Sequence, residues 1–180
     1  YYASIYNTQF INKSIYYLTL SSNQNHSEAQ FNLGEIYYSG EYISRYINKS
    51  IYYLTLSSNQ YNSKAQYLLG KIFSTDEYIG KNINKAIHYF KESSSFNNEY
   101  AKNNLGIIYK NGYGVEKNIY NAIEYFEEAI KQKNDSYSMY NLAIIYYFGI
   151  DIDRNIDKSI ELLEKATNNQ ILISDLFLFY

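Results

Sequence analysis

The chain has 180 residues, of which 46% are hydrophobic and 19% charged, so it can bury a substantial apolar core and is not a disordered tail. Its net charge of −2 leaves no excess of positive potential to neutralise a phosphate backbone, and we expect no nucleic-acid partner. Cys is absent, which excludes disulfides, thiolate metal sites and thiol nucleophiles; a cytoplasmic location is favoured, although the compartment stays open.

Turn-forming residues are sparse, since Pro is absent and Gly occurs 8 times. This scarcity favours helices joined by short loops. The 25 Tyr residues could form an aromatic binding surface. Tyr, Asn, Ile and Lys share AT-rich codons, however, and genome composition is the simpler explanation.

The sequence repeats itself with a period of 36 residues. The segment INKSIYYLTLSSNQ occupies residues 11–24 and again residues 47–60, and the similarity continues from AQFNLG to AQYLLG. Such a period is typical of solenoids, in which each unit buries its apolar face against its neighbours. We therefore predict an all-α fold, a single α-solenoid of tandem antiparallel helix-turn-helix repeats in a right-handed superhelix over residues 1–180. The expected units are a partial one at 1–28, full ones at 29–64, 65–100, 101–137 and 138–173, and the start of another at 174–180.

The N-terminal part of the sequence is expected to be the second half of a unit, because Tyr1-Tyr2 aligns with Tyr37-Tyr38. No initiator Met and no signal peptide are visible, so we expect a fragment from which flanking repeats are missing.

The first helix of each full unit begins at a small residue, with Leu four residues later, then Gly or Ala, then an aromatic three residues further on. These spacings place the residues on one stripe of a helix. A Gly inside a helix costs up to about 1 kcal/mol relative to Ala, so its recurrence predicts that a neighbouring helix packs closely there. Gly40, Gly112 and Gly149 follow the aromatic by three residues and predict left-handed helix ends. The stripe comprises Ala29, Ala65, Ala101 and Ser138; Leu33, Leu69, Leu105 and Leu142; Gly34, Gly70, Gly106 and Ala143; and Tyr37, Phe73, Tyr109 and Tyr146.

A second helix is predicted after a short loop in each unit. Its outer face is expected to carry exposed pairs such as Glu127 with Lys131 and Glu161 with Lys165. Its apolar pattern comprises Ser50, Ala86, Ala122 and Ser159; Ile51, Ile87, Ile123 and Ile160; and Leu54, Phe90, Phe126 and Leu163.

The C-terminal segment Ile171 to Tyr180 is the most apolar stretch, and it is far shorter than the roughly 20 residues that span a bilayer. We expect no membrane span. Ser174 and Leu178 fit the start of another first helix, so we predict an exposed hydrophobic patch that a dye-binding assay on a variant lacking residues 171–180 would test.

No pattern for catalysis, metal binding or a cofactor is found. His26 and His88 occupy unrelated positions of the repeat and have no partner by spacing. The segment from Asp151 to Asn155 resembles the start of a calcium loop, but Ile156 stands where Gly is needed. Glutamates at 124, 127 and 128 lack an accompanying Glu-x-x-His, and the Gly-x-Gly at 112–114 lacks a third Gly and a preceding strand.

The pattern of small residue, Leu-Gly, Tyr, Gly-x-Gly-Val and a Lys-Ala or Lys-Ser pair resembles the Sel-1-like repeat family, and residues 101–130 are the nearest match. The pattern departs from the family at Asp76, which replaces the loop Gly, and in units without a full counterpart of residues 112–115. The resemblance implies relatives of tetratricopeptide repeats that act mostly as adaptors, with the first helices lining a concave face.

By that analogy, side chains at outward positions of the first helices would meet a ligand. The alternative interpretation is that they pack between neighbouring first helices. The candidates are Phe31, Glu35, Tyr38, Tyr67, Lys71, Asn103, Lys110, Tyr140 and Tyr147.

We therefore predict a non-catalytic scaffold or adaptor that binds a protein or peptide. The alternative is an accessory repeat region of a larger signalling protein such as a kinase, acting as a spacer or recruiting a partner. An enzyme in its own right would need a constellation of residues that the sequence does not supply.

Overall fold

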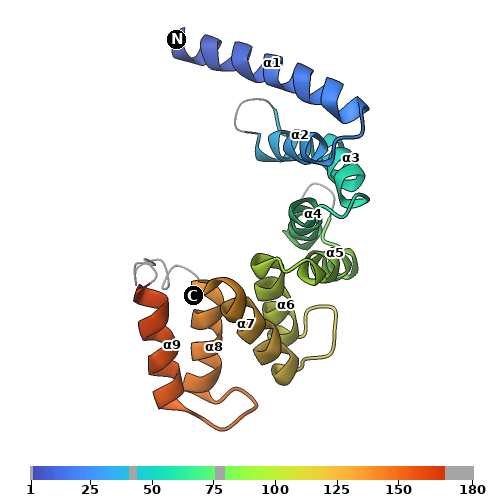
Figure 1. Cartoon of the computed structure of the whole chain (residues 1–180). Coiled ribbons are helices and arrows are strands. Elements are labelled where there is room, and N and C mark those ends of the chain that lie inside the picture. Colours follow the sequence, from blue (N-terminus) through green and yellow to red (C-terminus); the bar gives the residue numbers. More distant parts are fainter. Residues whose placement is uncertain (1, 41–43, 76–79, 169–180) are drawn as a thin grey trace. The chain divides into compact units, whose positions relative to one another are not determined.

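The computed structural model describes residues 2–40, 44–75 and 80–168. These residues form nine α-helices and no strand, which confirms the all-α prediction (Figure 1). The helices are α1 (Tyr2–Asn23), α2 (Ser27–Ser39), α3 (Ile47–Ser58), α4 (Ser63–Thr75), α5 (Ile83–Ser95), α6 (Glu99–Asn111), α7 (Ile119–Lys133), α8 (Ser136–Phe148) and α9 (Ile156–Asn168).

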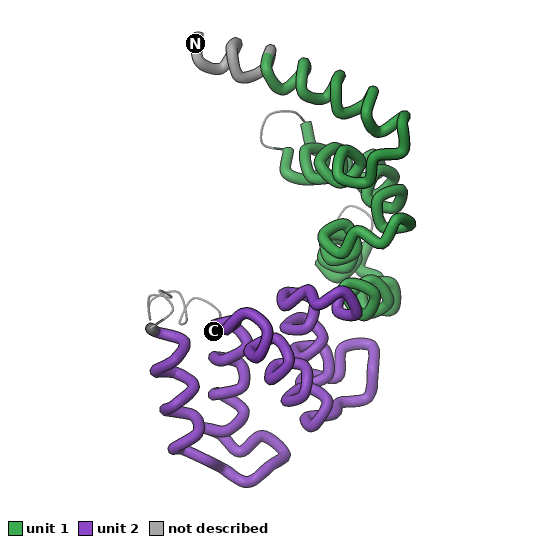
Figure 2. Tube along the Cα trace, in the orientation of Figure 1, with its two compact units in different colours: residues 1–93 green, residues 94–180 purple. Residues whose placement is uncertain are grey.

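The chain forms two compact units, residues 1–93 and residues 94–180 (Figure 2). In the first unit, α2 packs against α3, α4 against α5, and α1 against α2. In the second unit, α6 packs against α7 and α8 against α9. Each repeat is therefore a hairpin of a first and a second helix; the right-handed superhelix stays a prediction.

Asparagine and aspartate side chains start most of the described helices. The amide oxygens of Asn62 and Asn98 accept the backbone N–H of Ala65 and Ala101 at 3.1 and 3.0 Å. Such a bond satisfies one of the N–H groups that a helix leaves free at its first turn. His26 before α2 and Tyr46 before α3 make no side-chain cap, so this hairpin lacks a device that other repeats have.

Three of the first helices, α2, α6 and α8, end at glycines in the left-handed conformation, as the sequence predicts. The φ angles of Gly40, Gly112 and Gly149 are 65°, 73° and 64°. This conformation is strained for residues with a side chain and free of penalty for Gly.

The glycine within three of the first helices, α2, α4 and α6, lets the second helix approach closely. A Cβ atom on Gly34 would lie 2.5 Å from Cγ of Leu54, and one on Gly106 would lie 2.5 Å from Cε1 of Phe126. Gly70 faces Phe90 in the same way. The predicted close packing at these glycines is confirmed, and Leu54, Phe90 and Phe126 are almost completely buried.

An aromatic pair lies near the loop end of three hairpins. The rings stack at centroid distances of 5.6 to 5.8 Å between Tyr37 and Tyr53, between Phe73 and Tyr89, and between Tyr109 and Tyr125. The backbone carbonyl of the first ring's residue accepts an N–H from the start of the next helix, for example from Tyr46 to Tyr37 at 2.9 Å. The stacked rings and the backbone hydrogen bond together hold the two helices of each hairpin at its loop end.

Helix α1 differs from the expected loop-then-helix order. It runs without interruption from Tyr2 to Asn23, although its residues 4–10 align with the loop between α2 and α3. The helix-ending Gly40 corresponds to Ser4, whose Cβ atom disfavours the left-handed conformation. The predicted hydrophobic patch at residues 171–180 lies outside the described residues, as does Asp76.

Candidate functional site

The first compact unit contains five of the nine candidate residues, on α2 and α4. Glu35 and Lys71 are exposed and occupy aligned positions with opposite charge. Tyr38 is half-buried beneath the guanidinium of Arg45, whose Cζ lies 4.7 Å from the ring centroid. Tyr67 is also half-buried, with its ring 6.0 Å from that of Phe90.

The second unit contains the remaining candidates, on α6 and α8. Tyr147 is 44% exposed and lies edge-on to Phe148, with the guanidinium of Arg154 5.1 Å from its ring. Tyr140 is half-buried. The cation–π contact holds the ring of Tyr147 in place without covering it.

Two of the nine candidates are not directed outward. Phe31 and Asn103 are each 8% exposed, so the expected outward position is wrong for these two side chains. The ring of Phe31 lies under Nζ of Lys64 on α4, and the amide of Asn103 donates to Ser138 on α8 at 2.8 Å. The alternative interpretation, packing between neighbouring first helices, describes both residues.

Lys110 has unusual electrostatics for a residue of this surface. It lies in the last turn of α6 and is half-buried, and this desolvation lowers the pKa of its ammonium group. No carboxylate pairs with it among the described residues. Removing a charge from water without supplying a partner costs free energy, so Lys110 is a cation whose counter-charge the described part of the chain does not provide.

The residues that resemble chemical motifs have structural roles. Asp151 pairs with Lys117 at 2.6 Å, and the side chain of Asn155 caps α9 by accepting the N–H of Lys158. His88 does have a polar neighbour, because Oε1 of Glu92 lies 3.6 Å from its Nε2 on the next turn of α5, and both side chains are substantially exposed. His26 is exposed at the start of α2.

Two of the three glutamates of α7 form ion pairs with lysines of other helices. Glu127 pairs with Lys158 on α9 at 3.6 Å rather than with Lys131, whereas the predicted pair of Glu161 and Lys165 is present. Glu128 binds the buried ammonium of Lys102 at 2.9 Å. Across residues 2–40, 44–75 and 80–168, acidic and histidine side chains do not gather in a group that could hold a metal ion. None of the helices in these ranges has both the length and the hydrophobicity that crossing a membrane requires.

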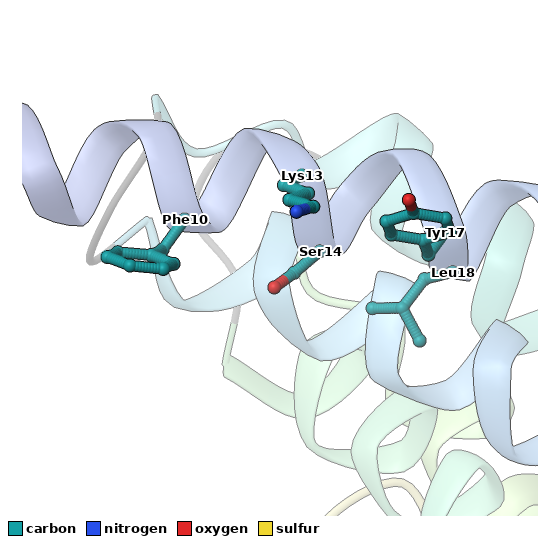
Figure 3. A pocket seen from close by; sticks show the side chains of 5 residues that line it. All are labelled: Phe10, Lys13, Ser14, Tyr17 and Leu18. Carbon is teal, nitrogen blue, oxygen red and sulfur yellow. The ribbon is translucent and has the colours of Figure 1, made fainter.

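The sequence pattern does not reveal one feature of α1. A groove of about 480 Å³ lies along one face of this helix (Figure 3). The duplicated segment could have located this groove, because residues 11–24 repeat residues 47–60 and Leu18 is less buried than its equivalent Leu54. The groove is lined by Phe10, Lys13, Ser14, Tyr17 and Leu18.

Tandem helical hairpins with a repeated glycine contact define an α-solenoid class of repeat protein. The model of the Sel1 repeat matches residues 11–26, 27–62, 63–95, 99–134 and 136–170. The chain therefore belongs to the Sel1 repeat family, whose members generally act as protein-interaction scaffolds. No match is found among the curated proteins.

Solved structures share this fold. A Sel1 repeat protein from Oxalobacter formigenes has a TM-score of 0.77 at 25% identity, over 87% of this chain and 64% of that one. The c5321 protein, a protective antigen present in uropathogenic Escherichia coli strains, has a TM-score of 0.81 at 21% identity, over 89% of this chain and 34% of that one. Cysteine rich protein B of Helicobacter pylori has a TM-score of 0.57 at 22% identity, over 72% of this chain and 93% of that one. This chain thus spans less than two thirds of the length of the first two proteins.

Proposed function

We propose that the chain is a non-catalytic scaffold that binds a protein or peptide partner through the outward positions of its first helices. The observation that carries this proposal is Lys110, a half-buried cation on α6 that no described carboxylate neutralises. A partner with an acidic side chain would supply the missing charge and turn an unfavourable burial into a charge-assisted contact.

The pattern of residues across repeats supports the same surface. Inward positions keep one residue type, as in Leu33, Leu69 and Leu105. The aligned outward positions vary from Glu35 to Lys71. Packing explains why the inward positions keep the same residue in each repeat, but it does not explain why the outward residues differ between repeats. A surface that recognises one particular partner needs such differences.

Aromatic and cationic side chains at adjacent repeats suit such a contact. Tyr147 aligns with Lys110 in the following repeat, and its ring is accessible and held by Arg154. Tyr and Arg are enriched among the few residues that provide most of the binding free energy in protein interfaces.

The experiment compares matched variants of the full chain as bait. Lys110→Met and Tyr147→Ser alter the proposed surface, while Lys131→Met and Tyr120→Ser make the same changes at exposed positions of α7. A partner captured from lysate and identified by mass spectrometry is then titrated against all four variants. We expect each change on the first-helix surface to weaken binding by about tenfold or more, and the α7 changes to leave it unaltered.

Equal affinity of the Lys110→Met and Lys131→Met variants would refute the proposed surface. Circular dichroism of each variant separates loss of contact from loss of fold, since a variant that keeps the wild-type spectrum and midpoint has lost only its contact.

A further inference from the structure

The second helices of the two units differ in charge. In the first unit, α1, α3 and α5 carry four lysines and one carboxylate, which belongs to Glu92 (Figure 1). In the second unit, α7 and α9 carry six carboxylates and four lysines. Equivalent helices therefore have an excess of positive charge in one unit and an excess of negative charge in the other.

Two lysines of the first unit occupy the same position in successive hairpins. Nζ of Lys49 lies 5.3 Å from the ring centroid of Tyr37, and Nζ of Lys85 lies 5.0 Å from that of Phe73. Both lysines are exposed, and neither forms an ion pair with a carboxylate of the described residues. The ring contacts hold each ammonium group in place without neutralising its charge.

Aromatic side chains lie beside these lysines on the same outer surface. Tyr52 follows Lys49 by three residues, His88 follows Lys85 by three, and both rings are largely exposed. Tyr16 aligns with Tyr52, and the two are 60% and 59% exposed, although only α3 packs against a first helix of its own repeat. The exposure of this surface therefore does not depend on a first helix behind it. The basic face comprises Tyr16, Lys49, Tyr52, Lys85 and His88.

The second unit has carboxylates at the equivalent outer positions. Glu124 of α7 and Glu161 of α9 align with Tyr52 and His88, and Asp157 lies one turn before Glu161. All three carboxylates are exposed. Within the described part of the chain, Glu124 and Asp157 form no ion pair, and Glu161 pairs with a lysine of its own helix. The acidic face comprises Glu124, Asp157 and Glu161.

We propose that the basic face of one copy of the chain docks on the acidic face of a second copy. Lys49 and Lys85 lie on successive repeats, as do Glu124 and Glu161, so both rows of charge follow the period of the repeat. Two ion pairs can then form in the same contact. Exposed ion pairs contribute little individually, and the ring of Tyr52 adds apolar contact area between them.

The matching period favours a second copy over an unrelated acidic partner, because a repeat of the same kind spaces its carboxylates as Lys49 and Lys85 are spaced. The two faces are different surfaces, so the contact is heterologous and each copy keeps one face available for another copy. The contact involves second helices and not Lys110 or Tyr147, so it does not depend on the function proposed for the first-helix surface.

Sedimentation velocity of the full chain, from micromolar to millimolar concentration, tests the proposal. We expect the average mass to rise with concentration at about 0.02 M salt. The association constant should fall by about tenfold or more at about 0.5 M salt, because salt screens ion pairs between exposed groups.

Charge reversal locates the contact. Lys49→Glu and Glu124→Lys should each weaken association by about tenfold or more, because each creates like charges across the contact. An equimolar mixture of these two variants should associate again, since the unaltered face of each variant meets the unaltered face of the other. Lys71→Glu and Glu35→Lys make the same charge changes at exposed positions of first helices and should associate like the wild type, with helix content equal in all four variants.

Three results would overturn the proposal. One is a chain that stays monomeric at millimolar concentration in low salt. Another is equal association of the Lys49→Glu and Lys71→Glu variants, which would place the contact elsewhere. The third is a mixture of Lys49→Glu and Glu124→Lys that associates no more strongly than either variant alone, because the two faces would then not be each other's partners.

Discussion

The contact between Gly106 and Phe126 allows a quantitative test of why a glycine recurs inside the first helices. In a Gly106→Ala variant the new Cβ atom would lie 2.5 Å from Cε1 of Phe126, whose side chain is completely buried. Ala is favoured over Gly in a helix by about 1 kcal/mol. Overpacking a core costs about 1–3 kcal/mol, so we expect a net loss of up to about 2 kcal/mol.

The last repeat suggests the compensating change. There Ala143 takes the place of the glycine and Leu163 the place of Phe126, and both pack in the same apolar cluster. Phe126→Leu alone should cost about 1–2 kcal/mol through the space it leaves. The double variant should cost less than the sum of the two single ones, with a coupling of about 1 kcal/mol or more.

Urea denaturation followed by circular dichroism measures the four free energies of this cycle, provided that the slope of each transition stays the same. If the free-energy costs of Gly106→Ala and Phe126→Leu add within about 0.5 kcal/mol in the double variant, the two residues do not interact, and the packing explanation is refuted. A higher midpoint for Gly106→Ala alone would have the same consequence, because helix propensity would then outweigh the contact.

Three further predictions concern local strain, capping and charge. Tyr61 has a φ of 62° in the turn before α4, and the equivalent residue before α2 is Asn25, with a φ of 64°. Asn adopts this left-handed conformation with less strain than Tyr, so Tyr61→Asn should stabilise the chain by about 0.5–1 kcal/mol. An unchanged midpoint in urea denaturation would contradict the strain at Tyr61. His26→Asn should supply the missing cap of α2 and raise the unfolding free energy by about 1 kcal/mol in urea denaturation, and an unchanged free energy would contradict this explanation. Burial lowers the pKa of Lys110 from its ordinary 10.5, so the folded state disfavours the charged form of this side chain. The resulting loss of stability is fully present at neutral pH and disappears as pH rises from the lowered pKa to 10.5. Lys110→Met should therefore raise the urea midpoint at pH 7, by an amount that shrinks towards pH 10.5. A gain independent of pH would show that the methionine acts through packing alone.

The helices and their ends could be predicted because they depend on local residues. Gly40 and Gly112 mark their helix ends by conformational freedom, and Gly34 marks close packing because a helix tolerates Gly poorly without a reason. The period of the repeat extends each such inference to every unit. These features are properties of a few residues close together in sequence.

The candidate surface was predicted less well, because exposure depends on the neighbouring repeat. Phe31 and Asn103 occupy aligned positions that the sequence predicts to face outward, yet each is buried against a residue of the next first helix. Glu127 has Lys131 one turn away on its own helix but pairs with Lys158 on α9. Sequence spacing describes one helix at a time, so it cannot identify a partner that another helix supplies.

The duplicated segment separates these two levels within one molecule. Residues 11–24 and 47–60 both form helix, and both end in the same turn: His26 and Asn62 donate their backbone N–H to Ser21 and Ser57 at 3.3 Å. Local structure therefore follows local sequence. Burial does not, since Leu54 is enclosed by α2 whereas Leu18 borders the groove. In a repeat protein of this kind the residues of one unit determine its helices, while the helices packed against the unit determine which of its side chains are buried.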